Sequence, residues 1–105
     1  RTDVVLTRFR ESVEWVLPYA QRPGWHAYIY STSNTLPPAA VCTASSVECL
    51  RIQNAGYEWH GYLRHVIDRY DRLADVTIFL QANPFTVSPD IHCLLNQTRL
   101  FKPVQ

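Results

Sequence analysis

The sequence has few glycines, no long apolar run and no excess of charge of either sign. Only three of its 105 residues are glycine, and ten basic residues against nine acidic ones give a formal charge of +1. Because no basic run or stripe is present, the composition gives no support for nucleic-acid binding. The longest apolar runs are far shorter than a membrane-spanning helix requires, so we expect no membrane span in this chain.

Cysteine is also scarce, and its count is odd. The three cysteines are Cys42, Cys49 and Cys93. An odd number means that at least one is free or pairs between chains. Cys42 and Cys49 flank a short loop and could be bridged, although spacing alone does not fix the geometry of a disulfide. The alternative is that all three are small buried apolar side chains.

Hydrophobic residues, in contrast, are plentiful. They make up 47% of the chain, which is enough for a core in a domain of this size. The length predicts one domain over residues 1–105. The chain begins with Arg1 rather than Met, which indicates a fragment or a processed form.

Runs of β-branched and aromatic residues predict four strands, at residues 3–9, 25–31, 46–53 and 75–81. Helices are predicted after the first, third and fourth strands, and a loop over residues 32–40 follows the second; Ser12 and Ser88 are the predicted N-caps of the first and last helices. Pro18 should kink or shorten the first helix. Strands that alternate with helices are typical of an α/β fold with a mostly parallel sheet flanked by helices. Because strands 3–9 and 75–81 are apolar without alternation, we expect 75–81 to be central and parallel to 3–9.

The helix that follows residue 56 has the clearest periodicity. Its apolar residues recur at helical spacing and form one stripe: Trp59, Leu63, Val66, Ile67 and Tyr70. The opposite side carries Arg64, His65, Asp68 and Arg69. An apolar stripe normally faces the core. We therefore expect Trp59, Leu63 and Ile67 to pack on the sheet. Arg64, His65 and Asp68 should be solvated.

Ligands of parallel sheets gather beyond the carboxyl ends of the strands. The candidate ligand-binding residues at those ends are Arg8, Asn54, Gly56, Glu58, Gln81 and Asn83. Arg8 and Arg10 could bind phosphates or be merely solvated, and alternation from Val4 and Leu6 favours Arg8. Gly56 would let the backbone approach a ligand closely. Glu58, at a helix start, could cap that helix or bind sugar hydroxyls. No catalytic residue is identified.

Residues 54–85 resemble a family of uncharacterised fungal-type proteins. The family signature runs Asn-x-Gly-x-Glu, Tyr-Leu, an aliphatic pair with Tyr-Asp, Leu-x-Asp, and a strand ending Phe-Leu-Gln or Phe-Leu-His. This sequence matches it from Asn54 to Gln81. The layout of that family is similar to that of GT-A glycosyltransferases, whose fold is Rossmann-like. In those enzymes a first strand and turn hold the nucleotide, and a later strand ends in an Asp-x-Asp that binds a divalent metal.

The resemblance implies a small or truncated glycosyltransferase-like domain that binds a sugar nucleotide. The location stays open, with the secretory pathway or the outside of the cell favoured. The sequence departs from the pattern at Gln81-Ala82-Asn83, which stands where Asp-x-Asp would be. Hard cations such as manganese prefer carboxylate oxygens, so a metal site is disfavoured. The alternative function is a non-catalytic module that binds a glycan or a protein. Enzymatic activity and oligomeric state stay open.

Overall fold

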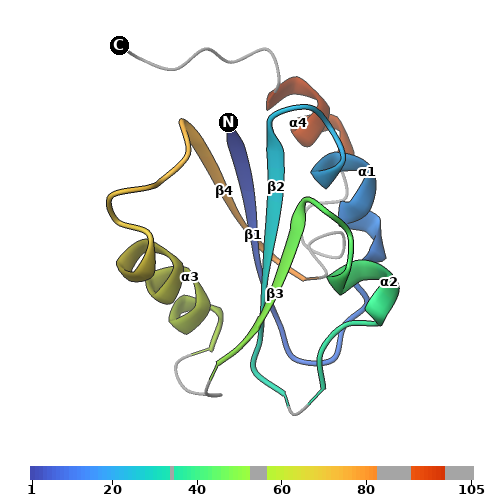
Figure 1. Cartoon of the computed structure of the whole chain (residues 1–105), viewed down its shortest axis with the longest axis vertical. Coiled ribbons are helices and arrows are strands. Elements are labelled where there is room, and N and C mark those ends of the chain that lie inside the picture. The colour runs from blue at the N-terminus through green and yellow to red at the C-terminus, as the bar shows by residue number, and fades with distance from the viewer. Residues whose placement is uncertain (34, 53–56, 83–90, 99–105) are drawn as a thin grey trace.

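The computed structural model describes residues 1–33, 35–52, 57–82 and 91–98; for residues 57–60, 94, 97 and 98 it describes the backbone alone. Strands and helices alternate along this part of the chain (Figure 1). In order, the elements are β1 (Thr2–Arg8), η1 (Glu14–Val16), α1 (Leu17–Ala20), β2 (Trp25–Ser31), α2 (Ala39–Cys42), β3 (Val47–Arg51), α3 (Tyr57–Asp68), β4 (Val76–Gln81) and α4 (Ile91–Thr98).

The four strands form one parallel sheet in the order β3-β2-β1-β4. Leu6 of β1 lies between Ile29 of β2 and Leu80 of β4 in this register. The prediction of an α/β fold with a parallel sheet flanked by helices is therefore confirmed. Strand 75–81 is parallel to strand 3–9, as predicted.

The expected central position of strand 75–81 is wrong, because β4 is an edge strand of the sheet that the described residues form. The chain passes from β1 to β2 to β3 in one direction and then returns through α3 to the free side of β1. This return makes β1 an inner strand, as β2 is. Phe79 of β4 is 39% exposed, which is typical of an edge strand rather than of a buried centre.

One face of the sheet carries the main hydrophobic core, beneath α1, α2 and α4 (Figure 1). Alternate residues of β1 and β2 point to this face, including Val4, Leu6 and Ile29, and all three are completely buried. Val16 of η1 and Val41 of α2 complete the same cluster. On this face of the sheet the residues that are buried are the hydrophobic ones, as their side chains predict.

The other face is covered by α3, and here the predicted orientation of the helix is wrong. Leu63 and Ile67 point outward and are 56% and 70% exposed, whereas His65 is completely buried. Arg64 and Asp68 are exposed as predicted and form an ion pair of 2.8 Å. The side chain of Trp59 lies outside the described residues. The side of α3 that packs on the sheet thus carries Gly61, Tyr62 and His65, and that face of the sheet offers His65 a polar partner, which is described below.

Local features also differ from the sequence prediction. Ser12 caps no helix, since the N-cap of η1 is Val13 and Pro18 lies in the first turn of α1. Residues 39–42 form α2, although residues 39 and 40 were expected in a loop. The predicted cap at Ser88 lies outside the described residues. Among the described helices, none is both long and apolar enough to cross a membrane.

Candidate functional site

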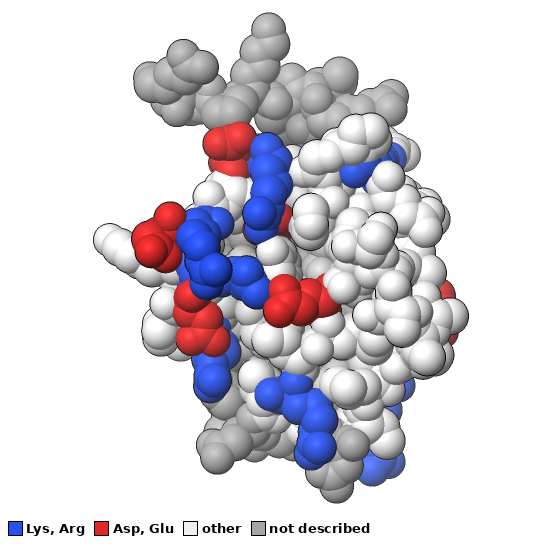
Figure 2. Space-filling model, viewed as in Figure 1, with Lys and Arg blue, Asp and Glu red and all other residues white. Residues whose placement is uncertain are grey.

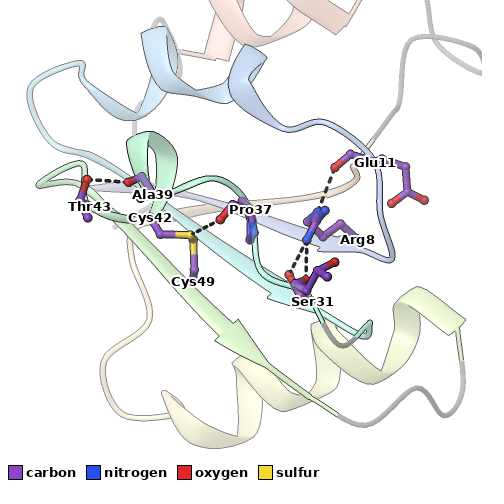
Figure 3. The surroundings of a disulfide bond; sticks show 9 residues. Arg8, Glu11, Ser31, Pro37, Ala39, Cys42, Thr43 and Cys49 are labelled. Carbon is purple, nitrogen blue, oxygen red and sulfur yellow. Dashed lines mark hydrogen bonds between the residues drawn. A yellow bond between two sulfur atoms is a disulfide. The ribbon is translucent and has the colours of Figure 1, made fainter.

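Arg8 ends β1, but its guanidinium is turned into the protein (Figure 3). Nε donates to the carbonyl oxygen of Glu11 at 2.9 Å, and Nη1 donates to the carbonyl of Thr35 at 2.9 Å and to Ser31 Oγ at 3.2 Å. The residue is only 6% exposed. Arg8 therefore joins the segments that follow β1 and β2, and its Nε and Nη1 groups donate to groups of the protein.

Arg8 also lies on the face of the sheet opposite α3. Its partner Ser31 is on the core side of β2, whereas the neighbouring Thr7 points to α3 and contacts Gly61. Glu58 belongs to the first turn of α3, and its side chain lies outside the described residues. The structure thus does not bring Arg8 to the side of the sheet on which α3 lies.

The other predicted site residues are only partly described. Gln81 is exposed at the carboxyl end of β4. Asn54, Gly56 and Asn83 lie outside the described residues, so their proximity to Gln81 stays a prediction.

The turn after β1 carries a second arginine, Arg10, and a carboxylate, that of Glu11, which accepts hydrogen bonds from the backbone. Glu11 Oε2 accepts from the backbone N–H of Phe9 at 2.7 Å and from that of Arg10 at 3.1 Å. Arg10 is exposed, and its guanidinium lies 5.0 Å from the centre of the Phe9 ring. Two convergent N–H groups of this kind can hold a carboxylate or a phosphate oxygen.

This turn lies beside the end of β4, because β1 and β4 are neighbours in the sheet. Ala82 N donates to the carbonyl of Thr7 at 3.2 Å, and the Ala82 carbonyl accepts from Trp15 Nε1 at 2.8 Å. The indole thus ties the segment after β1 to the end of β4. Arg10 and Gln81 are exposed polar side chains on the two sides of this junction.

The face under α3 holds a buried polar layer that sequence reasoning missed. Tyr30 Oη lies 2.9 Å from His65 Nδ1, and the ring of Tyr28 lies 4.8 Å from the imidazole. Asp3 is completely buried and accepts from Arg1 Nε at 3.0 Å. His65 Nε2 is buried with no hydrogen-bond partner among the described residues. The signal was the alternation of Tyr28 and Tyr30 in β2, which places both hydroxyls on one face.

Burial controls the titration of this layer. Burial lowers the pKa of His65, an effect that the Asp3 carboxylate opposes and the positive charge of Arg69 reinforces. Burial likewise raises the pKa of Tyr30. Both groups are therefore held in their neutral forms, which suits the hydrogen bond between them.

A disulfide joins Cys42 of α2 to Cys49 of β3, so the first of the two sequence alternatives for these residues holds (Figure 3). Cys42 Sγ lies 3.4 Å from the carbonyl oxygen of Pro37, in the segment whose Thr35 carbonyl receives Arg8. Cys93 is exposed on α4. The disulfide and Arg8 together fix the connection between β2 and α2.

Among the described residues, no three His, Cys, Asp or Glu side chains lie close enough to hold a metal ion. Alternation correctly puts Arg8 on the side of Val4 and Leu6, but that side carries the main core, so the Arg8 guanidinium is enclosed rather than offered to a ligand. Arg10 lies beyond the end of the strand and is exposed, which alternation within the strand could not predict.

Comparison with known proteins identifies the family and no closer relative. Residues 4–102 match the family model described as a protein of unknown function, DUF3431, so the chain belongs to that family. No curated protein and no solved structure matches the chain.

Proposed function

We propose that this chain is a glycosyltransferase-like domain that binds a sugar nucleotide beyond the carboxyl ends of β1 and β4. The supporting observation is the strand order β3-β2-β1-β4 with all strands parallel. The chain runs from β1 to β2 and β3 and then returns past β1 to β4, so the strand order reverses between β1 and β4, and both α1 and α4 lie on the same face of the sheet. Ligands of open parallel sheets bind at such a topological switch point.

Arg10 takes the role of phosphate contact in this proposal, in place of Arg8. It is exposed at the switch point, whereas Arg8 is committed to three internal acceptors. A guanidinium suits phosphate because its planar donors match two oxygens at once. Displacement of the Glu11 carboxylate would free the N–H groups of Phe9 and Arg10 for the same anion.

The remaining contacts are assigned to the sugar. Gln81 and Asn83 offer neutral amide groups that suit hydroxyls better than a hard cation. Asn54, Gly56 and Glu58 keep the roles proposed from sequence, with Glu58 accepting from sugar hydroxyls. Manganese would contribute little, because neutral oxygens replace the carboxylates of an Asp-x-Asp.

A non-catalytic module for a glycan or a protein is the second candidate. The internal commitment of Arg8 favours it, because the arginine that ends β1 is used for structure rather than for a ligand. The two candidates differ in what they bind: the first requires a nucleotide diphosphate group, and the second does not.

A thermal-shift panel separates them. The chain is heated with a series of nucleotide sugars, with nucleotide diphosphates and with free oligosaccharides, each with and without manganese. A donor at about ten times its dissociation constant should stabilise the fold by about 1.4 kcal/mol. For a domain of this size each 1 kcal/mol raises the melting temperature by about 4–8 °C.

The matched control is Arg10→Ala, which removes an exposed side chain and should leave the melting temperature of the free chain unchanged. The proposal predicts that a nucleotide sugar raises the melting temperature of the parent chain and raises that of Arg10→Ala much less. Stabilisation by oligosaccharides and not by any nucleotide would favour the second candidate. Equal stabilisation of both chains by the nucleotide would remove Arg10 from the site.

A further inference from the structure

The disulfide between Cys42 and Cys49 lies at the rim of the molecule rather than in its core. Cys42 belongs to α2 and Cys49 to β3, which is an edge strand of the described sheet. Both cysteines are half-buried, whereas their neighbours Ile29 and Val41 are completely buried. A small thiol in solution can reach a disulfide in this position more readily than one that is enclosed in a core.

The helix that the disulfide holds is a single turn. α2 has four residues, and no side chain donates or accepts a capping hydrogen bond at its N-cap, Pro38. A helix of this length is not stable by itself in water. Val41 is the one residue of α2 that is buried in the core. The covalent link to β3, together with Val41, therefore keeps α2 in place.

α2 in turn fixes the residues just before it. The N–H of Cys42 donates to the carbonyl of Pro38 at 3.2 Å, and Cys42 Sγ lies 3.4 Å from the carbonyl oxygen of Pro37. Thr35, two residues earlier, accepts from Arg8 Nη1 through its own carbonyl at 2.9 Å. Figure 3 shows Pro37 between the disulfide and the arginine. The position of α2 thus determines where an acceptor of the Arg8 guanidinium lies.

Arg8 carries this restraint to the turn after β1. Its Nε donates to the carbonyl of Glu11 at 2.9 Å, from the same guanidinium that donates to Thr35. The carboxylate of Glu11 accepts from the N–H groups of Phe9 and Arg10. Because a guanidinium is planar and rigid, a displaced acceptor on one side changes the direction of the donor on the other. Contacts therefore run without a break from the disulfide to two backbone N–H groups of the turn.

We propose that the disulfide between Cys42 and Cys49 is a reducible clasp that controls the order of the turn after β1 through Arg8. In the oxidised chain the clasp holds α2 on β3 and keeps the Thr35 carbonyl on the guanidinium. In the reduced chain α2 loses this attachment, Arg8 loses the acceptor, and Glu11 is no longer held over the N–H groups of the turn. The core stays folded, because the sheet and not the disulfide joins its completely buried residues.

The chemical step is thiol–disulfide exchange with a dithiol reductant. A thiolate of the dithiol attacks one sulfur of the clasp, the S–S bond breaks, and the other cysteine leaves as a thiolate that takes up a proton from water. The second thiol of the reductant then attacks the reductant's own sulfur in the mixed disulfide, which releases the remaining cysteine and closes the oxidised dithiol into a ring. The clasp gains two electrons and two protons, and the dithiol loses the same.

The clasp does not rest on the proposed function, because its effect is on the backbone of the free chain. Its consequence for a sugar nucleotide does rest on that function, since the turn after β1 is part of the assigned site. The test therefore uses the chain without any ligand, and its outcome is independent of whether a nucleotide binds.

Amide hydrogen exchange followed by NMR tests the proposal on the Cys93→Ser chain, oxidised and after reduction with dithiothreitol. Cys93→Ser removes the third cysteine, which is exposed on α4, and so prevents rearrangement of the disulfide. On reduction the amides of Thr43, Phe9 and Arg10 should exchange at least about tenfold faster, because local opening exposes them. Reoxidation should restore the original rates.

α1 provides a matched reference within the same chain. Like α2 it has four residues, and the N–H of Gln21 donates to the carbonyl of Leu17 at 3.0 Å, just as that of Thr43 donates to Ala39 at 2.9 Å. No cysteine lies in α1, so the exchange of Gln21 should not change on reduction.

Two variants separate the parts of the proposal. The double variant Cys42→Ser with Cys49→Ser should exchange like the reduced chain without any reductant. Arg8→Lys keeps the positive charge but cannot donate to two carbonyls from separate nitrogens. In Arg8→Lys, reduction should still speed the exchange of Thr43 but should no longer change that of the turn after β1.

Three results would overturn the proposal. If reduction leaves the exchange of Thr43 unchanged, the clasp does not hold α2. If reduction removes protection throughout β1 and β2, the disulfide is needed for the whole fold and is not a local clasp. If Thr43 responds but Phe9 and Arg10 do not, or if they respond equally in Arg8→Lys, the arginine does not couple α2 to the turn.

Discussion

His65 is completely buried between α3 and the sheet, with the hydroxyl of Tyr30 at 2.9 Å from its Nδ1. Its surroundings come from every strand of the sheet: Asp3 of β1, Tyr28 and Tyr30 of β2, Glu48 of β3 and Phe79 of β4. Burial lowers the pKa of His65 in the folded chain. A neutral imidazole is therefore part of the packing of α3, and protonation would act against that packing.

This gives a prediction for stability against pH. In the unfolded chain a histidine titrates near pH 6.5, above the lowered pKa of His65 in the folded chain. Between the two values the unfolded state binds a proton that the folded state does not, so the contribution of His65 is complete above about pH 6.5 and is lost as pH falls toward the folded pKa. The free energy of unfolding should decline there by up to about 1.4 kcal/mol per pH unit from this group.

Urea unfolding between pH 8 and pH 5 measures the decline. His65→Gln should lower stability at pH 8 and flatten the dependence below pH 6.5. If the free energy of unfolding falls with pH as steeply in His65→Gln as in the parent chain, the imidazole is not held neutral by burial.

At the scale of elements, α3 shows what periodicity can and cannot predict. The spacing correctly predicted a helix and correctly grouped Leu63 with Ile67 on one side. It did not predict which side of α3 faces the sheet, because that depends on the side chains that the sheet presents to the helix. Those side chains are Asp3, Tyr28 and Tyr30, which come from strands distant in sequence. Only the three-dimensional pairing with Tyr30 makes His65 rather than Leu63 the residue of α3 that is buried.

Gly61 also carried information about which side of α3 packs on the sheet, and the sequence prediction did not use it. Glycine inside a helix is unfavourable and usually has a packing reason. Here a Cβ on Gly61 would overlap Thr7 Oγ1 and lie 3.3 Å from Thr7 Cβ and Cγ2. The absent side chain thus lets α3 approach β1 closely.

Gly61→Ala should therefore destabilise the fold by about 1–3 kcal/mol, as overpacking does, although alanine has the higher helix propensity. The double variant Gly61→Ala with Thr7→Ala should regain part of this loss, because it removes the atoms that overlap. Chemical denaturation of Gly61→Ala, Thr7→Ala and the double variant measures the coupling free energy between the two positions. Stabilisation by Gly61→Ala alone would mean that α3 does not approach β1 so closely.

At the scale of the whole molecule, the parallel α/β architecture could be predicted from the alternation of strands and helices. The order of the strands could not, because it depends on the side to which each connection returns the chain. That is why strand 75–81 was expected at the centre and lies at an edge of the described sheet. The same limit affected the site: the residues at strand ends were identified, but not the burial of Arg8 by the segments around it.

The proposed ligand site is a consequence of this topology rather than of a motif. The switch point lies between β1 and β4, where Arg10 and Gln81 are exposed and Trp15 links the two ends.

Titration of the ¹⁵N-labelled chain with a nucleotide sugar, followed by the amide chemical shifts, tests the central claim most directly. The account predicts that the largest shifts cluster at Phe9, Arg10, Glu11, Gln81 and Ala82, and that Leu63 and Ile67 change little. Shifts centred on α3, or no shifts with any nucleotide sugar at millimolar concentration, would contradict the assignment of a sugar-nucleotide site to the switch point.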